Sequence, residues 1–173
     1  MSIDATTKQP AAGRLIIALA VVLVIAAGLA VWLWPRPGNP RTERALRSVL
    51  AIGGPAGWAS TEPVSLLPQD GQTGKTESRQ GVLVGILPGD AGFTATWTTT
   101  VDQPAACDTL ADWAVRVVQH PARDEVRDSC RAAGNGLFAS YGTPVSGGRK
   151  MFYAAADNGV LTAGVAYRSE NIG

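Results

Sequence analysis

The stretch FTATWTTTV at residues 93–101 decides the fold of this chain. Apolar side chains alternate along it with threonines. This period of two is typical of an antiparallel strand that turns one face to a core and the other to solvent. The segment GVLVGIL at residues 81–87 predicts another strand, and PGDAG at residues 88–92 is a turn signal between them. Together the two strands predict a β-hairpin.

Two helices are predicted after this hairpin. Residues 102–120 begin with Asp102, which suits the N-cap, and Pro104 is tolerated in the first turn. Apolar residues then recur at helical spacing, so that one face of this helix packs on a sheet. Residues 122–133 predict a second, shorter helix.

Three more strands are predicted toward the C-terminal end, at residues 137–141, 150–156 and 160–167. The last two flank the tripeptide Asp-Asn-Gly at residues 157–159. This is a hairpin-turn signal, because both central positions of a type I′ turn require a positive φ.

Ahead of the first hairpin, residues 41–52 predict a short amphipathic helix that Thr42 can cap. Arg44 and Arg47 lie on its polar side, where they form either a solvated helix face or a contact with anionic headgroups. The solvated face is the preferred interpretation.

Residues 57–67 predict an edge strand that Pro63 interrupts, and residues 68–80 predict a polar loop. The order of elements indicates the α+β class. We expect a small domain of antiparallel sheet with helices packed on one face.

Residues 15–34, LIIALAVVLVIAAGLAVWLW, contain no charge, amide or hydroxyl. A helix of this length spans roughly 30 Å, the thickness of a bilayer's hydrocarbon core. The run begins at Leu15, is flanked by Arg14, and ends at Trp34 before Pro35. It predicts an N-terminal transmembrane helix through which the chain contacts the lipid bilayer. A cleaved signal peptide is the alternative, but its apolar region is shorter.

The expected domain organisation has four parts. Residues 1–13 form a disordered cytoplasmic tail, residues 14–34 the transmembrane helix, residues 35–40 a Pro/Gly stalk, and residues 41–173 an extracytoplasmic α+β domain.

Two signals disagree about topology. The positive-inside rule places the C-terminal domain in the cytoplasm, because more arginines follow the span than precede it. The two cysteines instead suit an oxidising compartment. We expect a single-pass protein of the cell membrane whose C-terminal domain is extracytoplasmic. The arginines that follow the span are Arg36, Arg41, Arg44 and Arg47, and Lys8 and Arg14 precede it.

The two cysteines, Cys107 and Cys130, predict a disulfide that joins the two helices after the first hairpin. Two free buried thiols are the alternative if the domain is cytoplasmic. The chain has no C-x-x-C motif, which argues against redox activity. One histidine and two distant cysteines do not complete a tetrahedral zinc site.

Other patterns exclude further classes of function. A formal net charge of +1 argues against nucleic acid as a partner. The segment GQTGKT at residues 71–76 resembles a phosphate-binding loop, but Gln69 stands where that loop requires glycine. We therefore expect no nucleotide, and no cofactor or metal.

His120 is the only histidine, and no G-x-S-x-G motif accompanies it. A catalytic histidine requires a nucleophile and an orienting carboxylate, and the spacing identifies neither. We therefore expect no enzyme activity, and a hydrolase built around His120 is the least favoured hypothesis.

Three side chains are candidate partner contacts. Trp58 lies in a glycine-rich segment and is the tryptophan that this pattern most allows to be exposed, although a core position is the favoured interpretation. Thr96 and Thr98 lie on the polar face of the 93–101 strand. The favoured function is a non-catalytic protein-interaction module or accessory subunit of a membrane or envelope complex. The alternative is an extracytoplasmic ligand sensor or cell-wall binding module that uses the threonine face.

Overall fold

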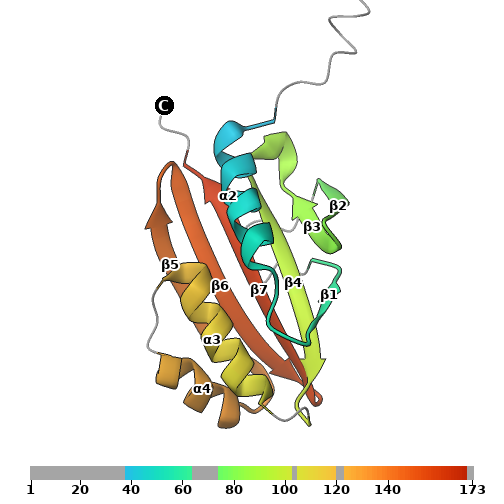
Figure 1. The fold of residues 1–173 in the computed structure, drawn as a ribbon, viewed down its shortest axis with the longest axis vertical. Helices are drawn as coiled ribbons and strands as arrows, with labels where there is room; N and C mark the ends of the chain where they lie inside the picture. Colours follow the sequence, from blue (N-terminus) through green and yellow to red (C-terminus); the bar gives the residue numbers. More distant parts are fainter. Residues whose placement is uncertain (1–37, 64–73, 103–104, 120–122, 171–173) are drawn as a thin grey trace, which may run out of the picture. The chain divides into compact units, whose positions relative to one another are not determined.

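The computed structural model describes residues 38–63, 74–102, 105–119 and 123–170. They fold into an antiparallel sheet with three α-helices (Figure 1). In chain order the elements are α2 (Pro40–Ile52), β1 (Ala59–Thr61), β2 (Lys75–Arg79), β3 (Val82–Ile86), the short 3-10 turn η1 (Pro88–Asp90), β4 (Gly92–Thr100), α3 (Ala106–Val118), α4 (Arg123–Arg131), β5 (Gly136–Val145), β6 (Gly148–Asp157) and β7 (Val160–Ser169).

β4 is the central strand of the sheet. The strand order is β2-β3-β4-β7-β6-β5, and every pairing is antiparallel. One edge of β4 pairs with β7 along its whole length. The other edge is shared, because β3 pairs with Phe93 to Ala95 and β1 pairs with Thr96 to Thr98. The predicted β3–β4 hairpin is therefore confirmed.

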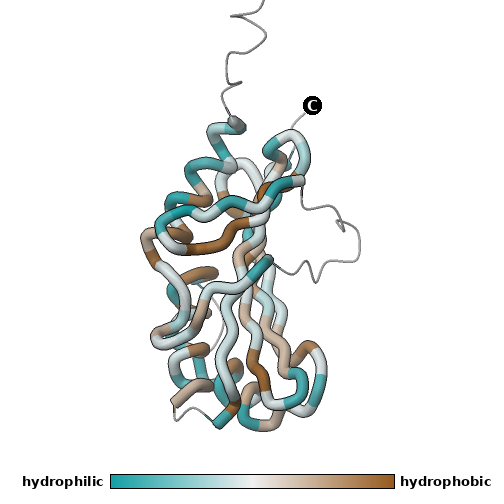
Figure 2. Tube along the Cα trace, turned by 90° about the vertical axis from the view of Figure 1, so that its right-hand side faces the viewer, coloured by the Kyte–Doolittle hydropathy of each residue, from teal (hydrophilic) through white to brown (hydrophobic). Residues whose placement is uncertain are grey.

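α2 and α3 lie against the same face of the sheet, and α4 lies beside α3 (Figure 1). The core forms between this face and the helices. β4 contributes Phe93, Ala95 and Trp97, whose side chains are at most 3% exposed. α3 contributes Trp113, whose ring meets that of Trp97 edge-on at 5.1 Å between centroids. In the side view of Figure 2, short hydrophobic stretches lie among hydrophilic ones along the described chain.

The expected fold class included a transmembrane helix, and this part is corrected. Among the residues that the structure describes, no helix combines the length and the apolar composition needed to cross a membrane. α2 and α3 have 13 residues each, against the roughly 20 that a bilayer requires. Their apolar side chains form one stripe that faces the sheet. The predicted span at residues 15–34, with the tail before it, lies outside the described residues.

Three predicted boundaries are also corrected. The segment read as a polar loop contains the strand β2, which has no apolar residue and pairs with β3 through its backbone. α3 begins at Ala106, and Asp102 lies in a turn before it. α2 is capped by Asn39, whose side-chain oxygen accepts from the Arg41 N–H at 3.0 Å. The Thr42 hydroxyl instead donates to the Asp90 carbonyl at 2.7 Å.

The β6–β7 turn follows the prediction. Asn158 and Gly159 have φ values of 47° and 81°, which the Asn-Gly pair adopts at low cost.

Candidate functional site

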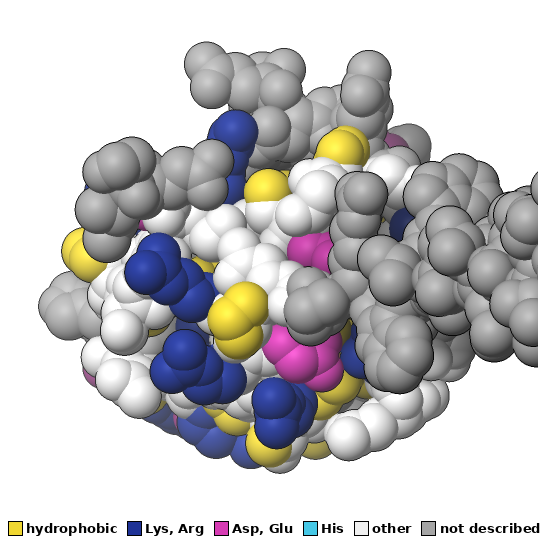
Figure 3. All heavy atoms as spheres, turned by 90° about the horizontal axis from the view of Figure 1, so that it is seen from above, with side chains coloured by type: hydrophobic (Ala, Val, Ile, Leu, Met, Phe, Trp, Pro, Cys, Tyr) yellow, Lys and Arg dark blue, Asp and Glu magenta, His cyan; other side chains and the backbone are white. Residues whose placement is uncertain are grey.

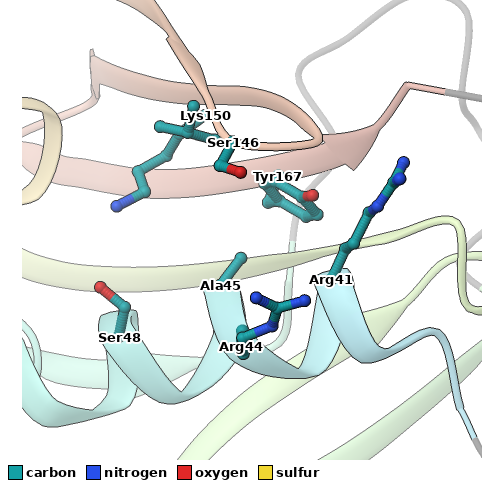
Figure 4. A pocket seen from close by; sticks show the side chains of 8 residues that line it. Arg41, Arg44, Ala45, Ser48, Ser146, Lys150 and Tyr167 are labelled. Atoms are coloured by element: carbon teal, nitrogen blue, oxygen red, sulfur yellow. The ribbon is translucent and has the colours of Figure 1, made fainter. Parts of the chain in front are cut away.

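A cavity of about 260 Å³ opens between α2 and the sheet. Figure 4 shows the α2 side chains on one side of it and side chains of β6, β7 and the β5–β6 turn on the other. Seen from above in Figure 3, Lys and Arg side chains gather on one part of this end of the molecule. The lining residues are Arg41, Arg44, Ala45, Ser48, Val145, Ser146, Lys150 and Tyr167.

The helix side of the cavity follows from the periodicity of α2. Arg41, Arg44 and Ser48 lie three and four residues apart, which places them on one stripe of the helix surface. The adjacent stripe carries Leu46 and Val49, which are at most 1% exposed and pack in the core. The helix therefore presents its basic stripe beside the stripe that packs in the core.

The sheet side comes from strand pairing and a tight turn. Lys150 of β6 lies opposite Tyr167 of β7 in the register, so both side chains point to the helix-bearing face. Ser146 lies in the turn between β5 and β6. Gly147 of this turn has a φ of 82° and its carbonyl accepts from the Tyr167 hydroxyl at 3.0 Å. This bond orients the tyrosine ring at the base of the cavity.

Among the described residues, the lining contains three cationic side chains and no carboxylate. Within the described ranges, none of the three forms an ion pair with a carboxylate. Their hydrogen-bond acceptors are neutral backbone carbonyls. Lys150 donates to Val117 at 3.2 Å, Arg44 to Pro40 at 3.2 Å, and Arg41 to Glu170 at 3.4 Å.

Several other arginines of the domain, unlike those that line the cavity, form ion pairs with carboxylates. Arg47 pairs with Glu43 at 4.0 Å on the same helix, and Arg79 pairs with Glu77 at 2.8 Å. On the α3–α4 side, Arg131 pairs with Asp108 at 3.2 Å. The cations that line the cavity therefore differ from Arg47, Arg79 and Arg131 in forming no described ion pair.

Burial acts on the titratable groups of the cavity. It lowers the pKa of the half-buried Lys150 ammonium, because removal from water penalises the charged form. Burial also raises the pKa of the Tyr167 hydroxyl, and the charges of Arg41 and Arg44 oppose that shift. A bound anion would oppose this lowering of the Lys150 pKa, because an opposite charge favours the ammonium form.

The structure places the predicted contact residues away from this cavity. Trp58 is 8% exposed, so its ring is buried. Thr96 is 0% exposed, and its hydroxyl lies 3.0 Å from the hydroxyl of Tyr153. Thr98 is partly exposed on the same strand. Neither Trp58 nor Thr96 presents its side chain at the surface.

The predicted disulfide is present. Cys107 of α3 and Cys130 of α4 are bonded, with 5.6 Å between their Cα atoms. An ion pair between Arg123 and Asp112 also joins the two helices. Within the described ranges, no three His, Cys, Asp or Glu side chains gather as candidate metal ligands. His120 lies outside the described residues.

The segment that resembled a phosphate-binding loop lies only partly within the described residues. Lys75 and Thr76 belong to the strand β2, and Lys75 forms an ion pair with Glu77. Here the chain runs as a strand after the GK pair, whereas a phosphate-binding loop continues into a helix.

Sequence reasoning missed the cavity because it treated the arginines of residues 41–52 as a solvated face. The spacing of Arg41, Arg44 and Ser48 was visible, but the distant Lys150 and Ser146 join them only through the tertiary fold. Comparison with protein-family models, with curated proteins and with solved structures finds no match to this chain.

Proposed function

We propose that this domain is a non-catalytic interaction module of an extracytoplasmic compartment, and that it recognises its partner by an anionic group bound in the basic cavity. One observation carries the proposal: Arg41, Arg44 and Lys150 line one cavity, and no carboxylate is among the described residues of its lining. Cations held together without counter-charge favour an anion, since each repels the others.

The cavity chemistry supports binding over catalysis. Its hydroxyl groups belong to Ser48, Ser146 and Tyr167. A serine nucleophile requires an adjacent general base, and among the described residues the lining holds neither histidine nor carboxylate. The Lys150 amine is engaged with the Val117 carbonyl, and the Tyr167 hydroxyl with the Gly147 carbonyl.

The disulfide supports the proposed compartment. Disulfides persist in oxidising environments and are rare in the cytosol. Cys107 and Cys130 are joined, and the described part of the chain contains no free cysteine.

The alternative site, a binding platform on the threonine face of β4, has less support. Thr96 would be its centre, but its side chain is 0% exposed and contacts Tyr153. A ligand on that face would reach Thr98 without reaching Thr96.

The test is a titration of the full chain with two small anions, acetate and methyl phosphate, followed by backbone amide NMR shifts. We expect saturable shifts at Ser48, Ser146 and Lys150 with at least one anion. Arg44→Ala should weaken that binding by about tenfold, because a hydrogen bond to a charged group contributes about 1.5–3 kcal/mol.

The matched control is Arg47→Ala, which removes an arginine from the same helix. Arg47 does not line the cavity and pairs with Glu43. Its loss should leave the binding unchanged. The proposal is rejected if neither anion produces saturable shifts, or if both variants weaken binding equally.

A further inference from the structure

We infer that the basic cavity selects a tetrahedral, doubly charged oxyanion, the terminal phosphate of a phosphomonoester, over a carboxylate. This inference rests on the proposed function, because it names the class of anion that the same site takes.

The placement of the donors favours a tetrahedral group. Arg41 and Arg44 belong to α2, while Lys150 and Ser146 belong to the sheet side of the cavity (Figure 4). A carboxylate has two oxygens in one plane, so it pairs best with a single guanidinium fork on one side. A phosphomonoester has three terminal oxygens that point in different directions. It therefore contacts donors on both walls of the cavity at once.

The charge of the cavity favours a dianion. Three cations line it, and their described acceptors are neutral carbonyls. A carboxylate would compensate one of these charges and leave two repelling each other. A phosphate dianion compensates two. The gain from compensating a charge is largest at Lys150, because this side chain is half-buried and poorly solvated.

Two hydroxyl groups are available as additional donors. Within the described part of the chain, Ser48 and Ser146 make no hydrogen bond through their side chains, and both line the cavity. The Tyr167 hydroxyl is different, because it already donates to the Gly147 carbonyl. A carboxylate accepts about four hydrogen bonds through its two oxygens, whereas a phosphomonoester offers three terminal oxygens to two arginines, a lysine and two serines.

The remaining lining suits the organic part of an ester. Ala45 and Val145 are partly exposed and contribute apolar surface, whereas Tyr167, which also lines the cavity, is 1% exposed. The volume of about 260 Å³ exceeds what an inorganic ion fills. A short carbon chain attached to the phosphate would lie against this apolar surface.

The pH dependence of binding separates a dianion from a monoanion. A phosphomonoester takes its second charge with a pKa near 6. The charged groups around the cavity are Arg41, Arg44 and Lys150 in its lining, with Glu43 on α2 and Glu170 after β7. A probe that carries one charge at both pH values reports any change in the charge of these protein groups. Relative to such a probe, the change in affinity in this range therefore reports the charge of the ligand.

The test compares methyl phosphate, dimethyl phosphate and acetate with the full chain by calorimetry, at about pH 5 and about pH 7.5. We expect methyl phosphate to bind about tenfold more tightly at the higher pH, because its dianionic fraction rises by that factor. Dimethyl phosphate and acetate carry one charge at both pH values and should change little. Lys150→Met should reduce the preference for methyl phosphate over acetate. The melting temperature of this variant is the control that shows whether the domain still folds.

The outcomes separate this inference from the proposed function. If acetate binds as tightly as methyl phosphate at about pH 7.5, the selectivity is rejected and anion binding stands. If none of the three probes binds, both the selectivity for phosphate and the proposed anion binding are rejected. Vesicles that contain phosphatidic acid, compared with phosphatidylcholine vesicles, identify the source of the phosphate. Arg44-dependent vesicle binding indicates a lipid headgroup, and binding of methyl phosphate without vesicle binding indicates a soluble ester.

Discussion

The ring of Tyr153 occupies the space that a side chain at Gly164 would fill. Tyr153 lies on β6 and Gly164 is its registered neighbour on β7. A Cβ placed at residue 164 would overlap the Cζ and hydroxyl of the tyrosine. Because glycine leaves this space open, the tyrosine crosses β7 and reaches β4, where its hydroxyl lies 3.0 Å from Thr96 and 3.4 Å from Thr94.

Gly164→Ala should destabilise the domain by about 3 kcal/mol or more. The added methyl group forces the Tyr153 ring out of its position and separates its hydroxyl from the threonines. The midpoint of urea unfolding measures the effect. Gly134→Ala is the control, because a Cβ there meets nothing within 4 Å. If Gly164→Ala lowers the unfolding midpoint only as much as Gly134→Ala does, the role assigned to Gly164 is wrong.

The two buried tryptophans Trp58 and Trp113 should respond differently to replacement by phenylalanine. The Trp113 indole N–H donates to the Gly53 carbonyl at 2.6 Å, whereas the Trp58 indole N–H has no hydrogen-bond partner in the described residues. Trp113→Phe should cost about 3 kcal/mol, because it leaves a carbonyl unpaired and removes ring contacts. Trp58→Phe should change stability by at most about 1 kcal/mol, because it also removes an unpaired buried donor. Equal losses in chemical unfolding would refute this assignment.

Removal of the disulfide should destabilise the domain by about 3 kcal/mol, since a cross-link over 23 residues limits the unfolded chain. The Cys107→Ser, Cys130→Ser double variant tests this by chemical unfolding. Hydrogen exchange should increase most in α4, which is held to α3 by the disulfide and by exposed ion pairs that contribute little. Reduced wild-type protein is the control and should match the double variant. Unchanged exchange in α4 would contradict the assigned role of the disulfide.

The domain should lose stability above about pH 10. Burial raises the pKa of Tyr153 above its ordinary value, and hydrogen bonds from Thr94 and Thr96 oppose this more weakly. The unfolded chain loses this proton at its ordinary pKa near 10, while the folded domain keeps it. The contribution to stability is therefore complete below that pH and is lost as the pH rises through the folded pKa.

Tyr153→Phe should make the unfolding free energy less dependent on pH between about 9 and 11. Urea unfolding at several pH values measures this slope, and phenolate absorbance follows the ionisation directly. Tyr141→Phe is the comparison, because burial also raises the pKa of Tyr141 but this side chain is only partly buried. If the unfolding free energy of Tyr153→Phe depends on pH as strongly as that of the wild type, other groups cause the pH dependence.

Local pattern predicted the elements whose side chains carry the signal. The alternation in β4 and the helical spacing in α3 are visible because burial on one face requires them. β2 was missed because its residues, KTESR, are all polar. Its position depends on backbone hydrogen bonds to β3, and the ion pair of Arg79 with Glu43 also joins it to α2. Neither interaction leaves a periodic pattern of apolar residues.

The face of β4 that alternation assigns to solvent is also partly buried. Thr94 and Thr96 are at most 3% exposed, although they lie opposite the helices. The alternation identifies two faces, but it does not show that Tyr153 crosses Gly164 to contact one of them. This is why Thr96 was predicted as a surface contact and lies in the interior.

The sequence alone determined the helices, most of the strands, the Asn-Gly turn and the cysteine pair, because each depends on neighbours within a few residues or on side-chain chemistry. The tertiary structure decided which distant residues meet. Lys150 and Ser146 face Arg41, Arg44 and Ser48 because antiparallel pairing places the β5–β6 turn beside the start of α2. Such a cavity leaves no local pattern, since the contacts that form it join residues about a hundred positions apart.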